Sequence, residues 1–255
     1  MDLRARHVVV TGASRGIGLA VGERFAAAGA KVTLVARSEA ALAAAAQRIG
    51  CGHAAADLLD VSALGALMVR LEALAPVDIL VSNAGVGTPG PVEQMTAEDL
   101  SGMFTLNALV PAELARLALP GMRERGQGRL VFMSSLSAEV ALPGLTAYSA
   151  TKAAVSQFAE GLRRDLQGSG VGVTTAELGP VDTGLYDEAT AYPPCADAFN
   201  RLLRLGMLTM LEPGQVADAI VQACRKDKAR VVLPRRGGAQ VAAARLPQWL
   251  ANRVL

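Results

Sequence analysis

Two kinds of segment alternate along the chain. Short apolar runs rich in β-branched residues predict strands, and longer segments with apolar residues at helical spacing predict helices. The predicted strands are 7–10, 31–36, 78–82, 129–133, 171–176 and 230–233, and the predicted helices are 17–28, 39–48, 62–74, 100–119, 147–166 and 213–225. Strands that alternate with helices from end to end are typical of an α/β protein. We therefore expect βαβ units and a parallel sheet.

Two segments interrupt this alternation. The long connection 184–210 contains Tyr186, Tyr192 and two prolines, and connections of this length in compact domains are often lids or binding loops. A disordered excursion is the alternative interpretation. The tail after Leu233 has apolar residues at near-helical spacing with arginines between them, which predicts a C-terminal helical extension at about 236–255. It could pack on the domain, on a partner or at a membrane surface, and we expect packing on the domain.

Length and composition restrict the class of protein. The chain of 255 residues suits a single domain over 1–255, and we find no linker in it. No apolar run is long enough to span a membrane, and the apolar stretch near the N-terminus is too short for a secretory signal, so we expect a cytoplasmic protein. The net charge is +2, with acidic and basic residues interspersed, which does not indicate nucleic-acid binding.

Cysteine and histidine are too few to indicate metal or hydrolytic chemistry. The three cysteines lack C-x-x-C spacing, so neither a disulfide framework nor a zinc site is predicted. Two histidines, His7 and His53, lie among strand-like residues. We expect structural roles for both and no metal site.

A glycine-rich turn follows the first predicted strand. Residues 11–18 read T-G-A-S-R-G-I-G, with glycines at 12, 16 and 18, and they open a predicted helix. Glycines there allow a tight turn, let the main chain approach a pyrophosphate and let the helix start close to the sheet. The free amides and the dipole of that helix terminus favour an anion. The turn therefore predicts a dinucleotide site.

The end of the second predicted strand indicates which dinucleotide. Proteins that bind NAD usually have an acidic residue there for the ribose hydroxyls, whereas this chain has Ala36 followed by Arg37. A guanidinium can bind a 2′-phosphate through two charge-assisted hydrogen bonds, and Arg15 in the glycine-rich turn could supply a second cation. We therefore expect NADP(H) in preference to NAD(H). The alternative is that Arg37 lies in solvent.

Tyr148 and Lys152 lie four residues apart in a predicted helix, so their side chains project from the same face. A positive charge close to a phenol favours the phenolate and lowers the pKa of the tyrosine from its ordinary value of roughly 10. Tyr148 is thus a candidate general acid or base. By itself the spacing is also common for a half-buried ring beside a solvated lysine.

These motifs together resemble the short-chain dehydrogenase/reductase family over about residues 5–235. The resemblance is carried by the glycine-rich turn, S-N-A-G at 82–85, Asn107, Ser135, Tyr148 and Lys152, with Tyr148 thirteen residues after Ser135. It implies a Rossmann-like fold, that is, a three-layer α/β/α sandwich with a doubly wound parallel sheet of about seven strands. It also implies a catalytic set of Asn107, Ser135, Tyr148 and Lys152. In such a set Lys152 binds the nicotinamide ribose, and Asn107 holds a water that connects the lysine to solvent.

The resemblance also implies the cofactor contacts. They are Gly12, Ser14, Arg15, Gly16, Ile17, Gly18, Arg37, Asp57, Leu58, Asn83, Ala84, Gly85, Tyr148, Lys152, Pro180, Val181 and Thr183. Asp57 and Leu58 correspond to the pair beside the adenine, and Thr183 to the threonine beside the nicotinamide carboxamide. One departure from the family pattern is Leu178, where the family usually has proline before glycine. We expect this change to loosen or reshape the turn at 179–183.

The implied function is an NADP(H)-dependent carbonyl reductase or alcohol dehydrogenase in which Tyr148 exchanges the proton. The substrate walls expected from the family layout are mainly apolar, which suits a hydrophobic small molecule: Val86, Val92, Met95, Leu136, Val140, Leu142, Leu145, Leu185 and Tyr186. Glu93 and Glu139 are the charges expected nearby. The resemblance further implies a homodimer or a homotetramer. The alternatives are an NADPH-binding sensor or a scaffold on the same fold.

Overall fold

A sheet of parallel strands forms the centre of the computed structural model, which describes residues 1–234. The strands are β1 His7–Thr11, β2 Lys31–Ala36, β3 Gly52–Ala55, β4 Val77–Ser82, β5 Gly128–Ser135, β6 Val171–Leu178 and β7 Arg230–Leu233, in the spatial order β3-β2-β1-β4-β5-β6-β7. The winding direction changes between β1 and β4. A crevice is expected at the carboxyl ends of the strands at this point, where ligands bind in open α/β sheets.

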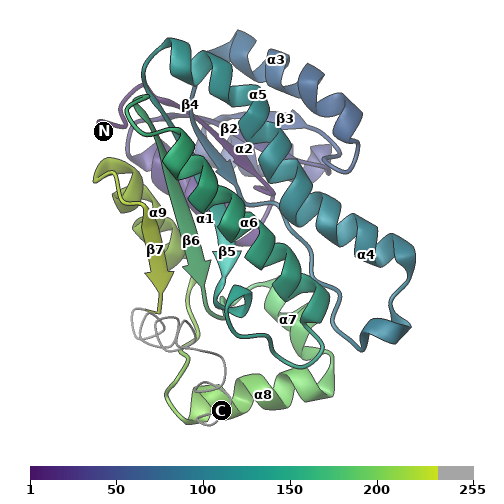
Figure 1. Cartoon of the computed structure of the whole chain (residues 1–255). Helices are drawn as coiled ribbons and strands as arrows, with labels where there is room; N and C mark the ends of the chain where they lie inside the picture. The colour runs from purple at the N-terminus through teal and green to yellow at the C-terminus, as the bar shows by residue number, and fades with distance from the viewer. Residues whose placement is uncertain (235–255) are drawn as a thin grey trace.

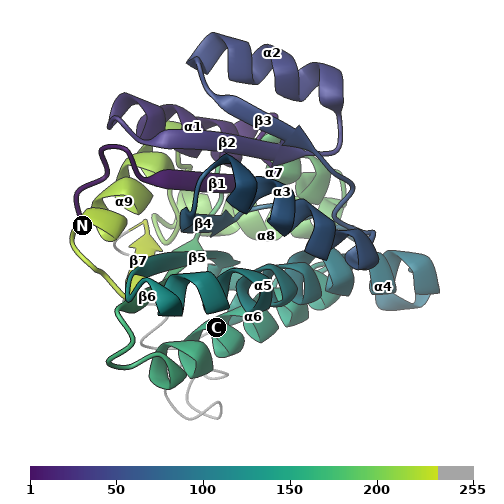
Figure 2. The same cartoon turned by 90° about the horizontal axis from the view of Figure 1, so that it is seen from above.

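Helices cover both faces of the sheet (Figures 1 and 2). They are α1 Gly16–Ala27, α2 Glu39–Ile49, α3 Leu64–Leu74, α4 Ala97–Phe104, α5 Val110–Glu124, α6 Thr146–Asp165, α7 Gly184–Thr190, α8 Pro193–Arg204 and α9 Pro213–Arg225. Figure 2 shows α1 and α9 on one side of the sheet and α5 and α6 on the other. The predicted doubly wound three-layer sandwich is confirmed.

Alternate residues of each strand point to opposite faces of the sheet and pack into two separate hydrophobic cores. On one face Val8 and Val10 of β1 pack with α1, α2 and α9. On the other face Val9 packs with α3, α5 and α6. Because both faces are covered, the central strands are buried throughout, which explains why they read as continuous apolar runs in the sequence.

The structure differs from the predicted elements in three places. The strand β3 has the sequence G-H-A-A, which contains no β-branched residue, so the sequence pattern did not single it out. The predicted helix 100–119 is two α-helices joined by a π-helical stretch, Thr105–Leu109, which contains Asn107. The connection 184–210 is largely helical, because it forms α7 and α8. The helical extension expected at 236–255 lies outside the described residues.

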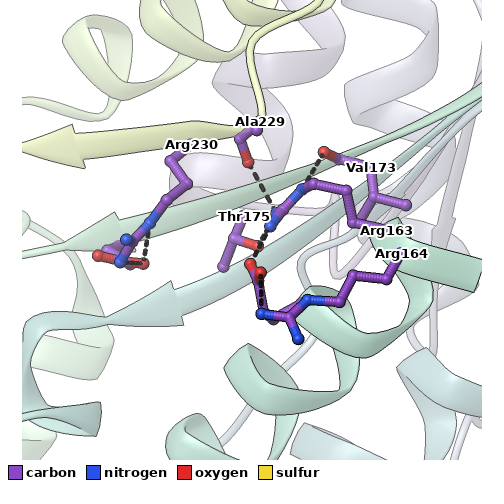
Figure 3. Close-up of polar contacts among 8 residues, drawn as sticks. Arg163, Arg164, Val173, Thr175, Ala229 and Arg230 are labelled. Atoms are coloured by element: carbon purple, nitrogen blue, oxygen red, sulfur yellow. Dashed lines mark hydrogen bonds and ion pairs between the residues drawn. The ribbon is translucent and has the colours of Figure 1, made fainter. Parts of the chain in front are cut away.

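Polar side chains fasten β6 to its neighbours on the α6 side (Figure 3). Arg163 of α6 donates to the Thr175 hydroxyl (3.1 Å) and to the Ala229 carbonyl (3.0 Å). Arg230 of β7 donates through Nε to Glu177 Oε1 at 2.9 Å. Since β6 leads directly into the turn at 179–183, these contacts fix the position of one wall of the crevice.

Candidate active site

A cavity of about 1020 Å³ occupies the crevice at the switch point of the sheet. Its walls come from the segments that follow the strands β1 to β6 and from the helices α4, α6, α7 and α8. Figure 1 shows α7 and α8 beyond the carboxyl ends of β5 and β6, where they cover this end of the sheet. The cavity thus combines the predicted dinucleotide site and the predicted substrate site.

The glycine-rich turn fits a pyrophosphate. Gly12 and Gly16 have φ angles of +64° and +59°, which L-residues with a side chain rarely adopt. A Cβ atom on Gly18 would lie 2.4 Å from the Gly12 carbonyl oxygen, so this glycine permits the start of α1 to pack against the turn. No side chain caps the N-terminus of α1. Its first amides and the helix dipole therefore face the cavity as an anion site.

Asn83 ties this turn to the segment after β4. Its Nδ2 donates to the carbonyl oxygens of Thr11 (2.9 Å) and Gly12 (3.2 Å). The Thr11 hydroxyl oxygen in turn accepts from the amides of Asn83 (3.0 Å) and Ala84 (3.1 Å). These reciprocal bonds hold together the two walls between which a dinucleotide would lie.

The predicted adenosine contacts follow β2 and β3. Arg37, Asp57 and Leu58 line the cavity there, Arg15 lines it from the glycine-rich turn, and Ala36 leaves no carboxylate at the end of β2. Arg15 also reaches α7, where its guanidinium lies 3.8 Å from the Glu188 carboxylate. Both partners are largely exposed, so this pair contributes little to stability.

Tyr148 and Lys152 both line the cavity from the first turns of α6. The Lys152 ammonium lies 5.5 Å from the centre of the Tyr148 ring and donates to the Met133 carbonyl oxygen at 3.0 Å. Burial raises the pKa of Tyr148 to about 12, an effect only partly offset by a hydrogen bond with Ser135. Burial also lowers the pKa of Lys152 to about 8.

The expected direction of the tyrosine pKa shift was therefore wrong for the protein without cofactor. Desolvation of the phenolate is the largest cause, and the opposing effect comes from the hydrogen bond with Ser135. The Lys152 ammonium donates to a backbone carbonyl instead. A protonated phenol is nevertheless the form that can give a proton to a substrate oxygen.

Ser135 and Asn107 occupy different depths. Ser135 ends β5 at the cavity wall, and its hydroxyl donates to the Leu178 carbonyl oxygen at 3.3 Å. Asn107 is buried behind the wall, where its side chain makes two bonds with the main chain of Val86 (2.9 and 2.8 Å) and donates to the Thr151 hydroxyl (3.1 Å). Of the predicted site residues, Asn107 and Gly18 do not line the cavity.

The turn at 179–183 is held by main-chain bonds despite Leu178. The Gly179 amide donates to the Leu233 carbonyl oxygen at 2.7 Å, which joins the turn to β7. The Pro180 carbonyl accepts from the Leu211 amide (3.0 Å), and the Asp182 amide donates to the Leu211 carbonyl (2.9 Å). These bonds fix the main chain at this wall without a proline at position 178.

The substrate side of the cavity agrees with the predicted walls except at two positions. Val92 and Met95 do not line the cavity, because residues 92–94 form a short 3₁₀ helix that leaves Val92 exposed. Neither Glu93 nor Glu139 lines it. The lining residues that sequence reasoning missed include Met103 and Leu106 before α5, and Phe199, Leu202, Met207 and Leu208 in and after α8. The apolar residues at helical spacing in 193–204 are the sequence signal from which α8 could have been predicted.

Comparisons with known proteins agree with this geometry. A family model described as short chain dehydrogenase matches residues 6–193. The ketoacyl reductase HetN of Nostoc sp. is 32% identical over 239 residues, which cover 91% of this chain and 79% of that protein.

Solved structures give the same result. A short-chain dehydrogenase from Streptomyces avermitilis has a TM-score of 0.83 and 31% identity, and the match covers 100% of this chain and 95% of that one. A 3-oxoacyl (acyl-carrier-protein) reductase from Agrobacterium tumefaciens, solved with NADP bound, has a TM-score of 0.81 and 32% identity, with 91% of this chain and 94% of that chain covered.

Proposed function

This chain belongs to the short-chain dehydrogenase family of oxidoreductases, and from that premise we propose that it interconverts a carbonyl group and an alcohol on an apolar small molecule with NADP(H). One observation carries the proposal: the hydroxyls of Ser135 and Tyr148 and the ammonium of Lys152 line the same cavity as the glycine-rich turn. A dinucleotide on that turn and a substrate beside Tyr148 would therefore meet in one continuous space.

In the reductive direction each residue has a separate task. When NADPH is bound on the glycine-rich turn, its nicotinamide would supply the hydride for the carbonyl carbon. Tyr148 gives its proton to the oxygen that becomes the alcohol, and Ser135 donates a hydrogen bond to the same oxygen as negative charge develops on it. Lys152 binds the ribose hydroxyls and favours the tyrosinate that is left after proton transfer. Asn107 holds the water through which that proton is replaced.

The preference for NADP(H) rests on Arg15 and Arg37. Both residues line the cavity, Arg37 directly after β2 and Arg15 in the glycine-rich turn, and Ala36 leaves no carboxylate at the end of β2 to repel a 2′-phosphate. The Agrobacterium tumefaciens structure, which has NADP bound, supports the same preference for this chain.

The apolar character of the substrate rests on the lining beside Tyr148. Leucine and valine side chains dominate it, and within residues 1–234 the cations that line the cavity are Arg15, Arg37 and Lys152, all with proposed cofactor roles. HetN is a ketoacyl reductase, which supports a ketone on an aliphatic carbon chain.

Among the helices of the described part of the chain, none is both long and apolar enough to cross a bilayer. The homodimer, or homotetramer, stays a prediction.

Replacement of Tyr148 by Phe tests the proposal. Purified protein is mixed with NADPH and a panel of aliphatic ketones, and the loss of NADPH absorbance is followed. We expect wild-type turnover, a decrease of about 10² to 10⁴ in kcat for Y148F, and nearly unchanged NADPH affinity by fluorescence titration. Binding of NADPH without turnover of any ketone would indicate a sensor instead, and equal kcat in Y148F would refute the role of the phenol.

A further inference from the structure

Ser137, a residue outside the predicted catalytic set, contacts Ser135 directly. It lies in the 3₁₀ helix Leu136–Ala138, which follows β5, and it is buried at the cavity wall. Its hydroxyl donates to Ser135 Oγ at 2.9 Å, and its main-chain amide donates to the same oxygen at 3.1 Å. Ser135 is thereby also the N-cap of this short helix.

These two hydrogen bonds restrict the Ser135 hydroxyl to the role of a hydrogen-bond donor. A serine hydroxyl oxygen has two acceptor positions and one proton to donate. Ser137 fills both acceptor positions, so Ser135 can only donate. Its proton is directed to the Leu178 carbonyl at 3.3 Å, beyond the usual length of such a bond. Donation of the same proton to the Tyr148 phenolate is the hydrogen bond that lowers the pKa of Tyr148, so the donor also reaches the side of the cavity where a substrate oxygen could accept it.

We propose that Ser137 is a positioning residue that holds Ser135 as a hydrogen-bond donor toward the substrate carbonyl oxygen. Its hydroxyl prevents Ser135 from turning its proton away and polarises the Ser135 O–H bond, because hydrogen bonds in a chain strengthen one another. A carbonyl oxygen only accepts, so a serine restricted to donation is complementary to it. This inference rests on the proposed carbonyl chemistry.

The first test removes the Ser137 hydroxyl but keeps its amide. We expect Ser137→Ala to lower kcat for ketone reduction about tenfold, the effect of one ordinary hydrogen bond, with an unchanged Kd for NADPH. Ser137→Cys keeps the side-chain volume but is a weak donor, so it should lower kcat similarly. Ser156→Ala is the matched control, because it breaks a serine–serine bond of 2.6 Å, to Ser134, without touching Ser135. Its kcat should stay within about twofold of wild type.

A double-mutant cycle separates positioning from a structural role. If Ser137 acts through Ser135, then Ser137→Ala should have no further effect on kcat in the Ser135→Ala background. Additive losses, or a kcat of wild-type level in Ser137→Cys, would overturn the inference. If Ser137→Ala does not fold by circular dichroism, the Ser137→Cys pair of the cycle gives the same decision. A wild-type protein that reduces no ketone would instead refute the proposed function.

Discussion

Arg37 is the single residue on which the cofactor prediction can be decided. It lines the cavity directly after β2. We expect Arg37→Asp to raise the KM for NADPH at least about tenfold, because a charge-assisted bond is lost and a carboxylate repels the 2′-phosphate. The KM for NADH should change much less.

The control is Arg70→Asp, which makes the same charge change at an exposed position of α3 away from the cavity. Initial rates with both cofactors measure the effect. An equal change for NADPH and NADH in Arg37→Asp would contradict the assignment to the 2′-phosphate.

Lys152 gives a pH dependence of stability. Burial lowers its pKa from 10.5 to about 8, so between these values the folded protein binds fewer protons than the unfolded chain. The contribution of Lys152 to the free energy of unfolding should therefore rise with pH across this window, by on the order of 3 kcal/mol at most. Burial raises the pKa of Cys195 and Cys224 from 9.0 to about 11 and about 12, so these two thiols act in the opposite direction from about pH 9, and Tyr148 does so from about pH 10.

Urea denaturation measures the free energy of unfolding at a series of pH values from about 7.5 to 9.5. We expect Lys152 to titrate in this range and Tyr148 to titrate above it. The contribution of Lys152 is the difference between wild type and a variant without this lysine. Lys152→Met removes the titrating group, so its unfolding free energy should rise less over the same range. Parallel curves for the two proteins would show that Lys152 does not titrate in this window.

At the scale of single residues, the sequence predicted those members of the site whose roles depend on their spacing along the chain. The glycines of the turn and the Tyr148–Lys152 pair are of this kind, and the structure brings them to one cavity. The contact between Ser137 and Ser135 depends on a 3₁₀ turn after β5, which no periodicity indicates. Likewise, the sign of the Tyr148 pKa shift depends on burial, which the sequence does not specify.

Helix α8 is the element with the clearest consequence for substrate choice. Its inner stripe consists of Cys195, Phe199 and Leu202, spaced four and three residues apart. Cys195 is buried, whereas Phe199 and Leu202 line the cavity and are only half-buried. The apolar face of this helix thus faces cavity space in which a carbon chain could lie.

We expect Leu202→Trp to reduce kcat/KM for long aliphatic ketones at least about tenfold, because the larger side chain fills this space. Short ketones and NADPH affinity should be affected much less. The control is Leu205→Trp at the end of the same helix, where the side chain is 65% exposed. A chain-length series of ketones measures the effect, and equal losses for short and long ketones would argue against a chain site under α8.

The helices and strands that were predicted with correct ends are those whose ends are marked by local sequence. Strands β2 and β7 and helix α9 begin and end at the predicted residues, because apolar runs and Pro213 mark them. The segment 184–210 was predicted as a connection, because tyrosine, proline and acidic residues interrupt the apolar pattern of its helices. Those helices are stabilised by contacts such as the packing of Tyr186 on Phe199, with ring centres 5.3 Å apart. Such contacts between elements are not readable from the sequence alone.

The whole molecule is organised around the reversal between β1 and β4. The glycine-rich turn and Arg37 follow the first strands of the chain. Ser135 ends β5, Tyr148 lies in α6, and the turn at 179–183 follows β6. The two parts meet through the pairing of β1 with β4 and the bonds of Asn83. The alternation of strands and helices predicted the parallel sheet, whereas the reversal of winding was expected only from the family resemblance.

Helices α1 and α9 lie side by side although nearly two hundred residues separate them in the chain (Figure 2). Val21 and Phe25 of α1 share one core with Val216 and Ile220 of α9, and Arg24 pairs with Asp218 at 2.8 Å. During synthesis on the ribosome, α1 emerges long before its covering helix exists. The apolar surface of α1 therefore stays uncovered until α9 has been synthesised, and folding of the N-terminal half cannot be completed before then.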